Sequence, residues 1–200
     1  MIALEPPFRL ATPEDAGVLA GLVDIAGDGL PSHLWRRMAE PGEDPWEIGR
    51  RRQAAKARAG GAVVVDEGEG PVALLMGHAL PPEPEPIDPD TPAPVRPLEE
   101  LERLAPATWY INVLAVLPEH RGRGLGGRLL ALAERIAADE ALTGLSLIVP
   151  DHNLLARRLY ERHGYEELAR RDIVRDGWET RGEEWILMVR GAGTIPDAEG

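Results

Sequence analysis

The stretch LPEHRGRGLGGRLLALAERI, residues 117–136, changes character midway: glycines and arginines come first, and a leucine-rich run follows. From Gly124 to about Asp139 the apolar residues recur at helical spacing, which predicts an amphipathic helix. The first turn of a helix carries unpaired amide hydrogens and partial positive charge, and glycines leave room for a ligand there. The turn therefore predicts a cradle for an anion, most naturally a phosphate or pyrophosphate.

Glycine-rich turns between a strand and a helix also occur for packing reasons alone. A P-loop needs Gly-Lys followed by Ser or Thr, and the segment GGRL at 126–129 lacks this. A dinucleotide fingerprint needs Gly-x-Gly-x-x-Gly, which Gly122, Gly124 and Gly127 satisfy, with an acidic residue at the end of the next strand. That strand ends in LIVPDHN, and the unit follows an antiparallel hairpin, so this context fits poorly.

The periodicity along the rest of the chain predicts an α/β protein in the α+β sense, with a mixed, mostly antiparallel sheet and helices on both faces. The strand–helix–strand unit around the glycine turn predicts two parallel neighbours with a right-handed crossover. Residues 1–190 are expected to form one domain, residues 81–97 an acidic proline-rich surface loop, and residues 191–200 a flexible tail. The expected strands are 9–11, 62–65, 72–78, 109–117, 145–149, 165–175 and 184–189, and the expected helices are 12–26, 31–40, 45–60, 98–104, 124–139 and 153–163.

The amino-acid composition excludes some classes of function. The 200 residues carry a formal net charge of -12, which argues against general nucleic-acid binding and would favour a cationic substrate. The sequence contains no cysteine, which excludes a disulfide framework and a cysteine nucleophile. The sequence shows neither a signal peptide nor a run long enough to span a bilayer, so we expect a cytoplasmic protein that binds no membrane.

Two motifs in order carry a resemblance. The first is Arg121-x-x-Gly124-x-Gly126, preceded by INVLAVLPEHR. The second, NLLARRLYERHGYEE, begins at Asn153 and matches Asn-x-x-Ala-x-x-Leu-Tyr-Glu-x-x-Gly-Tyr/Phe. Together they resemble the GNAT superfamily of N-acetyltransferases, which bind acetyl-coenzyme A (acetyl-CoA). The resemblance is close from Tyr110 to Val189.

The resemblance implies how the co-substrate acetyl-CoA would be held. Family members splay the central strand from the next one at a bulge, and the pantetheine arm pairs with backbone groups in the gap. Asn153 would contact that arm, and Tyr160 would act as the general acid toward the departing thiolate. The remaining cofactor-binding positions are Leu114, Ala115 and Val116 in the gap, and Arg121, Gly122, Arg123, Gly124, Leu125 and Gly126 around the pyrophosphate.

The general base is not specified by the motifs. Many family members place a glutamate where this chain has Tyr110 or Ile148. Asn112 shares a face with Tyr110 if strand alternation holds, so a water chain anchored by both could accept the amine proton. Other candidates lie on the early helices and the long loop, namely His33, Glu40 and His78. His120 and His152 are interpreted as surface residues, and the sequence shows no metal cluster.

The expected function is direct transfer of an acetyl group from acetyl-CoA to a primary amine. One alternative is a module that binds acyl-CoA without turning it over, and another is an NAD-dependent oxidoreductase. The acceptor would be a small molecule or a peptide terminus, and the acids of the early loops would attract a cationic one. Dimers are common among relatives, so a homodimer is one expected assembly.

Overall fold

The computed structural model describes residues 3–191, and its centre is a seven-stranded sheet in the order β1-β2-β3-β4-β5-β7-β6. Neighbouring strands are antiparallel except for β4 and β5, which are parallel. This confirms the predicted mixed sheet with one parallel pair. The strands are β1 (Phe8–Leu10), β2 (Ala62–Asp66), β3 (Pro71–Ala79), β4 (Trp109–Val116), β5 (Gly144–Pro150), β6 (Glu166–Asp172) and β7 (Glu184–Gly191).

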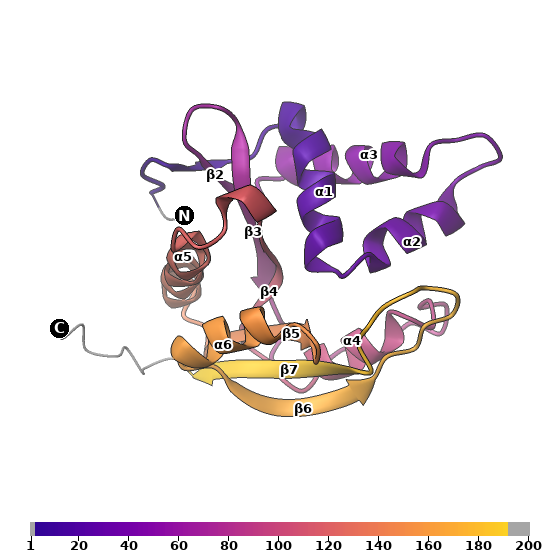
Figure 1. Cartoon of the computed structure of the whole chain (residues 1–200). Helices are drawn as coiled ribbons and strands as arrows, with labels where there is room; N and C mark the ends of the chain where they lie inside the picture. Colours follow the sequence, from indigo (N-terminus) through magenta and orange to yellow (C-terminus); the bar gives the residue numbers. More distant parts are fainter. Residues whose placement is uncertain (1–2, 192–200) are drawn as a thin grey trace.

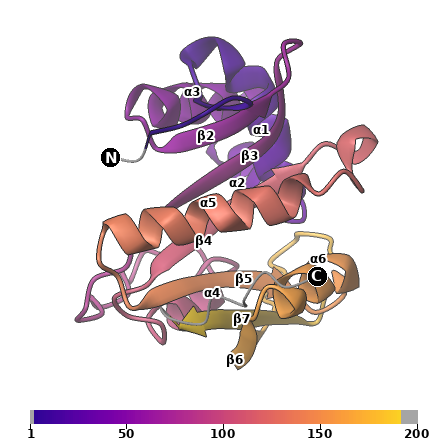
Figure 2. The same ribbon diagram turned by 90° about the vertical axis from the view of Figure 1, so that its left-hand side faces the viewer.

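Helices cover both faces of the sheet. Figure 1 shows α1, α2 and α3 on one side of β3 and β4 and α5 on the other, and Figure 2 shows α5 crossing in front of the sheet. The helix α5 begins directly after the glycine turn, as its leucine periodicity predicts. The helices are α1 (Ala16–Ala26), α2 (Leu30–Met38), α3 (Pro45–Arg58), α4 (Arg96–Glu102), α5 (Leu125–Asp139) and α6 (Leu154–Arg162), with short 3₁₀ turns at Pro13–Asp15 and Pro118–His120.

Separate hydrophobic clusters fill the two faces of the sheet. One face packs α5 and Tyr160 of α6 against β2, β4, β5 and β7. The other face holds one cluster under α1 and α3 and a second around Leu101 of α4, Tyr110 and Trp185. Burying both faces gives the central strands the nearly continuous apolar runs seen in the sequence.

Two predicted boundaries differ from the structure. The helix α4 begins at Arg96, inside the expected loop 81–97, because Pro97 fits the first helical turn and a turn at Pro92–Val95 leads into it. Gly191 belongs to β7 and pairs with Gly144, so the strand continues into the expected tail. Residues 192–200 of that tail lie outside the described residues. None of the helices within residues 3–191 is long and apolar enough to cross a membrane.

The loop between β6 and β7 reaches across to the start of α2. In Figure 1 it rises beside α4 toward the helices α1 and α2. The Trp178 indole donates a hydrogen bond to the carbonyl oxygen of Asp28 at 3.2 Å and its ring stacks on Trp185 at 5.8 Å. These contacts join the end of the sheet to the helical layer.

Candidate active site

The parallel strands β4 and β5 separate after three residue pairs. The ladder runs from Trp109, opposite Leu145, to Ile111, opposite Leu147, and no pairing follows within the described residues. Both strands continue beyond this point, β4 to Val116 and β5 to Pro150. The backbone of β4 after Ile111 therefore faces β5 across a gap, which is the arrangement that an inserted extended ligand needs.

A bulge at Asn112 sets the direction of β4 beside the gap. The register with β3 shifts there: Met76 lies opposite Val113, whereas the next residue, Gly77, lies opposite Ile111. A Cβ on Gly77 would lie 2.5 Å from the Tyr110 carbonyl oxygen and 2.5 Å from the Trp109 ring. Only glycine allows this close approach, so Gly77 permits the bulge.

The bulge changes which side chains share a face. Tyr110, Asn112 and Val113 all line one cavity. The prediction that Asn112 shares a face with Tyr110 is thus confirmed, and the extra residue brings Val113 to the same side. Leu114 and Val116 consequently pack toward the α5 side of the sheet, while Ala115 packs under α1.

The glycine turn presents free amides at the mouth of the gap. Within residues 3–191, none of the amides from Gly122 to Gly127 donates to a backbone carbonyl, and the first bond of this helix comes from Arg128 to Gly124. Gly122 and Gly124 have φ values of 76° and 77°, a left-handed conformation that turns successive amides the same way. This is the donor set that a diphosphate requires.

The two arginines of the glycine turn, Arg121 and Arg123, have different hydrogen-bond partners. Nε of Arg121 donates to the Val116 carbonyl oxygen at 3.2 Å, which joins the turn to the end of β4. The Arg123 guanidinium makes a two-pronged ion pair with Glu67 of the β2–β3 hairpin, at 2.7 and 2.9 Å. Arg123 therefore anchors the turn, whereas Arg121 keeps the end of its guanidinium at the exposed rim.

The second motif packs against the first. A Cβ on Gly126 would lie 2.9 Å from Cδ2 of Leu159 in α6, with Cδ2 of Leu114 in β4 at 4.0 Å. The three segments therefore meet at the first turn of α5. Tyr160, the next residue of α6, lies in the same hydrophobic cluster and is 7% exposed. Its ring is tilted against that of Tyr165, with the ring centroids 5.8 Å apart. Burial raises the pKa of Tyr160 to about 12, so its hydroxyl keeps its proton at neutral pH.

Asn153 has a structural role in this chain. Its side-chain oxygen accepts a hydrogen bond from the Ala156 amide at 3.2 Å and so caps α6. The side-chain NH₂ group remains available on an exposed residue. The contact with a coenzyme arm that the resemblance implies would therefore have to come from this NH₂ group.

On the opposite face of the sheet, beside the bulge, lies a cavity of about 990 Å³. Its floor contains Tyr110, Asn112 and Val113 of β4, with Ile148 of β5 and Trp185 of β7. Its walls come from the end of α1, from α2 and α3, and from the loop before α4. Because Asn112 of β4 and Ile148 of β5 both line it, the cavity adjoins the gap between these two strands.

A chain of polar groups leads out of this cavity. The pKa of Tyr110 is raised by the carboxylate of Glu102 on α4 and lowered by the side chain of Asn112, so both groups lie near its hydroxyl. Burial raises the pKa of Glu102 to about 7, and the charge of Glu99 adds to this, while the nearby Tyr110 hydroxyl partly offsets it. Burial also raises the pKa of Tyr110, which is 4% exposed.

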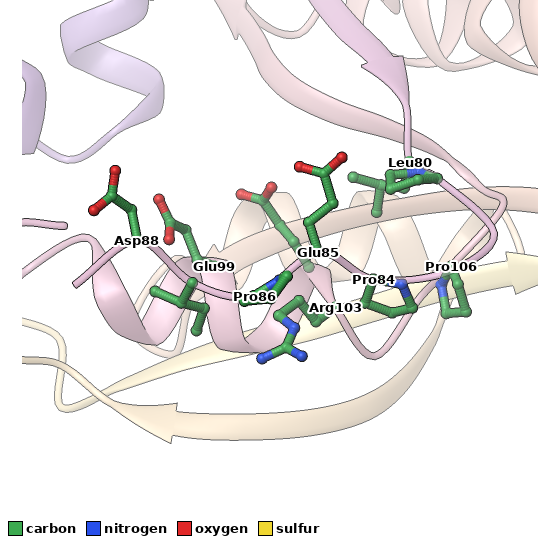
Figure 3. A pocket seen from close by; sticks show the side chains of 11 residues that line it. Leu80, Pro84, Glu85, Pro86, Asp88, Glu99, Arg103 and Pro106 are labelled. Carbon is green, nitrogen blue, oxygen red and sulfur yellow. The ribbon is translucent and has the colours of Figure 1, made fainter. Parts of the chain in front are cut away.

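Glu102 opens on its far side into a second, smaller cavity of about 330 Å³ between α4 and the proline-rich loop. Figure 3 shows this cavity, with the carboxylates of Glu85, Asp88 and Glu99 directed to one side and the Arg103 guanidinium directed to the other. The Tyr110–Glu102 pair thus lies between the large inner cavity and an outer, acid-lined one.

Glu102 was not among the sequence candidates for the base. It lies eight positions before Tyr110, in the short helix after the proline-rich loop, and the packing of Leu101 in the hydrophobic cluster around Tyr110 holds this helix against the sheet. The one signal in the sequence was an acid in the last turn of a helix that leads directly into the central strand.

The other candidate bases lie outside the large cavity. His33 and Glu40 do not line it, and His78 packs the edge of its ring on Tyr110 at 5.6 Å. His120 bonds the Arg123 guanidinium at 2.9 Å, and His152 lies 3.4 Å from Asp28. Within residues 3–191 we find no group of three or more histidine, aspartate or glutamate side chains placed to hold a metal ion.

A splayed parallel pair beside a cradle of free amides is the arrangement that the resemblance of the two sequence motifs implies. The model of the Acetyltransferase (GNAT) family matches residues 29–165. The chain belongs to the GNAT family of acetyltransferases.

Known proteins with similar sequences or folds agree with this assignment. The uncharacterized N-acetyltransferase YhfO of Bacillus subtilis is 44% identical over 59 residues, 30% of this chain and 40% of that protein. Thialysine N-epsilon-acetyltransferase of Bos taurus is 31% identical over 77 residues, 36% of this chain and 43% of that protein. The matches thus span less than half the length of these curated relatives. A crystal structure of an acetyltransferase, 19% identical, superposes with a TM-score of 0.61 over 93% of this chain and 99% of that one.

Proposed function

We propose that this chain transfers an acetyl group from acetyl-CoA directly to a primary amine. The observation that carries the proposal is the junction of two features at Asn112: free amides and an open strand edge on one side, and the large cavity on the other. The similarity to the bovine relative, an N-epsilon-acetyltransferase, supports an amino group as the acceptor.

The residues of the glycine turn fit the coenzyme. Amides from Gly122 to Gly126, with Arg121 at the rim, would hold the diphosphate, and the edge of β4 from Leu114 to Val116 would hold the pantetheine arm. The bound co-substrate supplies a thioester whose acyl carbon an amine can attack. A backbone amide near Val116 would donate to the carbonyl oxygen as it gains negative charge.

The amine must lose a proton while its nitrogen bonds the acyl carbon and the carbon–sulfur bond breaks. Tyr110 passes that proton: its oxygen accepts a proton from the amine side while its own hydroxyl proton moves to Glu102. Asn112, whose side chain lies near the same oxygen, would hold Tyr110 in place. A carboxylate that changes its protonation near neutral pH suits this task, because a general base works best near the working pH.

Tyr160 acts at the leaving group. A hydroxyl with a pKa of about 12 holds its proton more firmly than a thiol does, so it stabilises the departing thiolate by donating a hydrogen bond. Because the sequence has no cysteine, an acyl-cysteine intermediate cannot form, and transfer takes place with both substrates bound.

The test is thiol release from acetyl-CoA over a panel of primary amines, with calorimetry of coenzyme binding alongside. We expect release that depends on the amine and no burst of acetyl-enzyme without it. Binding of acetyl-CoA without release over a broad panel would instead identify a module that only holds the coenzyme. Stabilisation by NAD but not by coenzyme A would indicate the oxidoreductase alternative.

A further inference from the structure

The large cavity has a charge opposite to that of the whole chain. The chain carries a net charge of -12, yet three cationic side chains line this cavity, Arg37, Arg52 and Lys56, against one carboxylate, Asp90. Arg37 forms an ion pair with Asp176 of the β6–β7 loop. Within the described part of the chain, no carboxylate pairs with Arg52 or Lys56.

Arg52 and Lys56 differ from the neighbouring arginines on α3, which form ion pairs with carboxylates. Arg50 pairs with Asp44 and Glu47 at 2.9 and 2.8 Å, and Arg51 pairs with Glu43 at 2.7 Å. Neither lines the cavity. The basic face of α3 therefore divides: Arg50 and Arg51 are paired at the surface, and Arg52 and Lys56, one helical turn apart, remain at the cavity.

Two buried polar groups of the cavity lining also lack partners. Gln53 is 5% exposed, and its side-chain oxygen accepts no hydrogen bond from residues 3–191. Trp185 is 3% exposed, and its indole N–H donates none there. Buried polar groups are rarely left without partners, so this unpaired acceptor and donor mark a polar region within the wall of the cavity.

We propose that the acceptor of the reaction is a small amine that also carries an anionic group, and that Arg52 and Lys56 bind this group. The inference rests on the proposed function. The amino group lies at Tyr110 and Asn112, beside the gap, and the anionic group lies against the α3 wall. The apolar lining, which includes Val23, Leu34 and Val113, suits a short hydrocarbon spacer between the two ends.

This differs from the cationic acceptor that the overall acidity suggested. A second positive charge on the substrate would face Arg52 and Lys56 at close range, where the local field outweighs that of distant surface acids screened by salt. The anion-binding pair therefore also rejects diamines.

The test uses probes that share a four-carbon chain: γ-aminobutyrate, butylamine and putrescine, with phosphoethanolamine to distinguish a phosphate from a carboxylate. Calorimetry measures their binding with and without coenzyme A, and thiol release from acetyl-CoA measures turnover. We expect at least one anionic probe to bind about tenfold or more tightly than butylamine, and putrescine to bind weakest. The better of γ-aminobutyrate and phosphoethanolamine identifies the anionic group.

The variants Arg52→Gln and Lys56→Gln, alone and combined, should remove the preference for the anionic probes and leave butylamine binding within about twofold. Both side chains are exposed, so the fold should persist. Arg51→Gln is the matched control, because Arg51 precedes Arg52 on α3 but pairs with Glu43. The double variant should keep the coenzyme affinity of the unaltered chain.

Two results would overturn the inference: equal or tighter binding of butylamine or putrescine, or an equal loss in Arg51→Gln. Binding decides this inference, and thiol release decides the proposed function. Anionic probes that bind at Arg52 and Lys56 without being acetylated would thus support the anion site and contradict the transferase.

Discussion

The substitution Glu102→Gln removes the proton acceptor and keeps a side chain of the same shape that can still accept the bond from Tyr110. Because Glu102 is the proposed acceptor of the Tyr110 proton, we expect kcat/KM at pH 8 to fall about 100-fold or more, the usual contribution of a general base. In the unaltered chain, the plot of log kcat/KM against pH should bend near 7, where Glu102 titrates. This bend should be absent from the variant.

We expect the same substitution, which lowers activity, to raise folding stability at pH 8. A carboxyl with a pKa near 4.5 when unfolded and about 7 when folded binds more protons in the folded chain between these values. The free energy of unfolding of the unaltered chain therefore falls as pH rises through this range, by up to about 3 kcal/mol. Glutamine has no such dependence, so Glu102→Gln should be the more stable chain at pH 8 and lose that advantage toward pH 5.

The surroundings of Glu102 differ from those of the other acids on α4, and this difference provides a control variant. Tyr110 faces it from β4 and Glu99 from the preceding turn of α4, while Glu85, Asp88 and Arg103 line its outer cavity. Glu100→Gln is the matched control, because Glu100 lies on the same helix but pairs with Arg171 at the surface, at 2.9 Å. A variant Glu102→Gln that keeps the bend near 7 and the original kcat/KM would refute the assignment of the base.

Three further predictions concern other parts of the site. Tyr160→Phe should lower kcat about tenfold or more while calorimetry finds coenzyme affinity unchanged, whereas an equal loss of affinity would mean that the hydroxyl serves binding. Gly77→Ala should lower the free energy of unfolding in urea by about 3 kcal/mol or more, since its Cβ would lie 2.5 Å from the Tyr110 carbonyl oxygen, and a neutral result would show that the bulge yields easily. Ser146→Ala should cost about 1 kcal/mol, because it removes the buried 2.7 Å hydrogen bond to Thr108 at the start of the parallel pair, and an unchanged midpoint of thermal unfolding would contradict this.

Local sequence signals predicted most of the fold. The leucine spacing after Gly124 and the proline and glycine boundaries of the helices depend on nearby residues, so they could be read along the chain. The amide cradle could be predicted from the same stretch, because glycines before a helix readily adopt the left-handed conformation that turns successive amides the same way.

The parts that could not be predicted depend on contacts between distant segments. The bulge at Asn112 needs Gly77 of the neighbouring strand, and the burial of Glu102 needs α4 to pack on the sheet. The separation of Arg52 and Lys56 from Arg50 and Arg51 depends on which side of α3 meets the cavity. A linear pattern shows a basic helix but not which of its charges remain without partners.

The short ladder between β4 and β5 has a consequence for the mechanics of the sheet. Within residues 3–191, only the pairs from Trp109 to Ile111 join a half-sheet of four strands to one of three, so hydrogen bonding between the halves is weakest along this line. A ligand extended in the gap would connect the two half-sheets by contacting both strands. Amide exchange along β5 and β7 should then slow when coenzyme is added, and unfolding should become more cooperative, because the ligand supplies connections that the polypeptide leaves out.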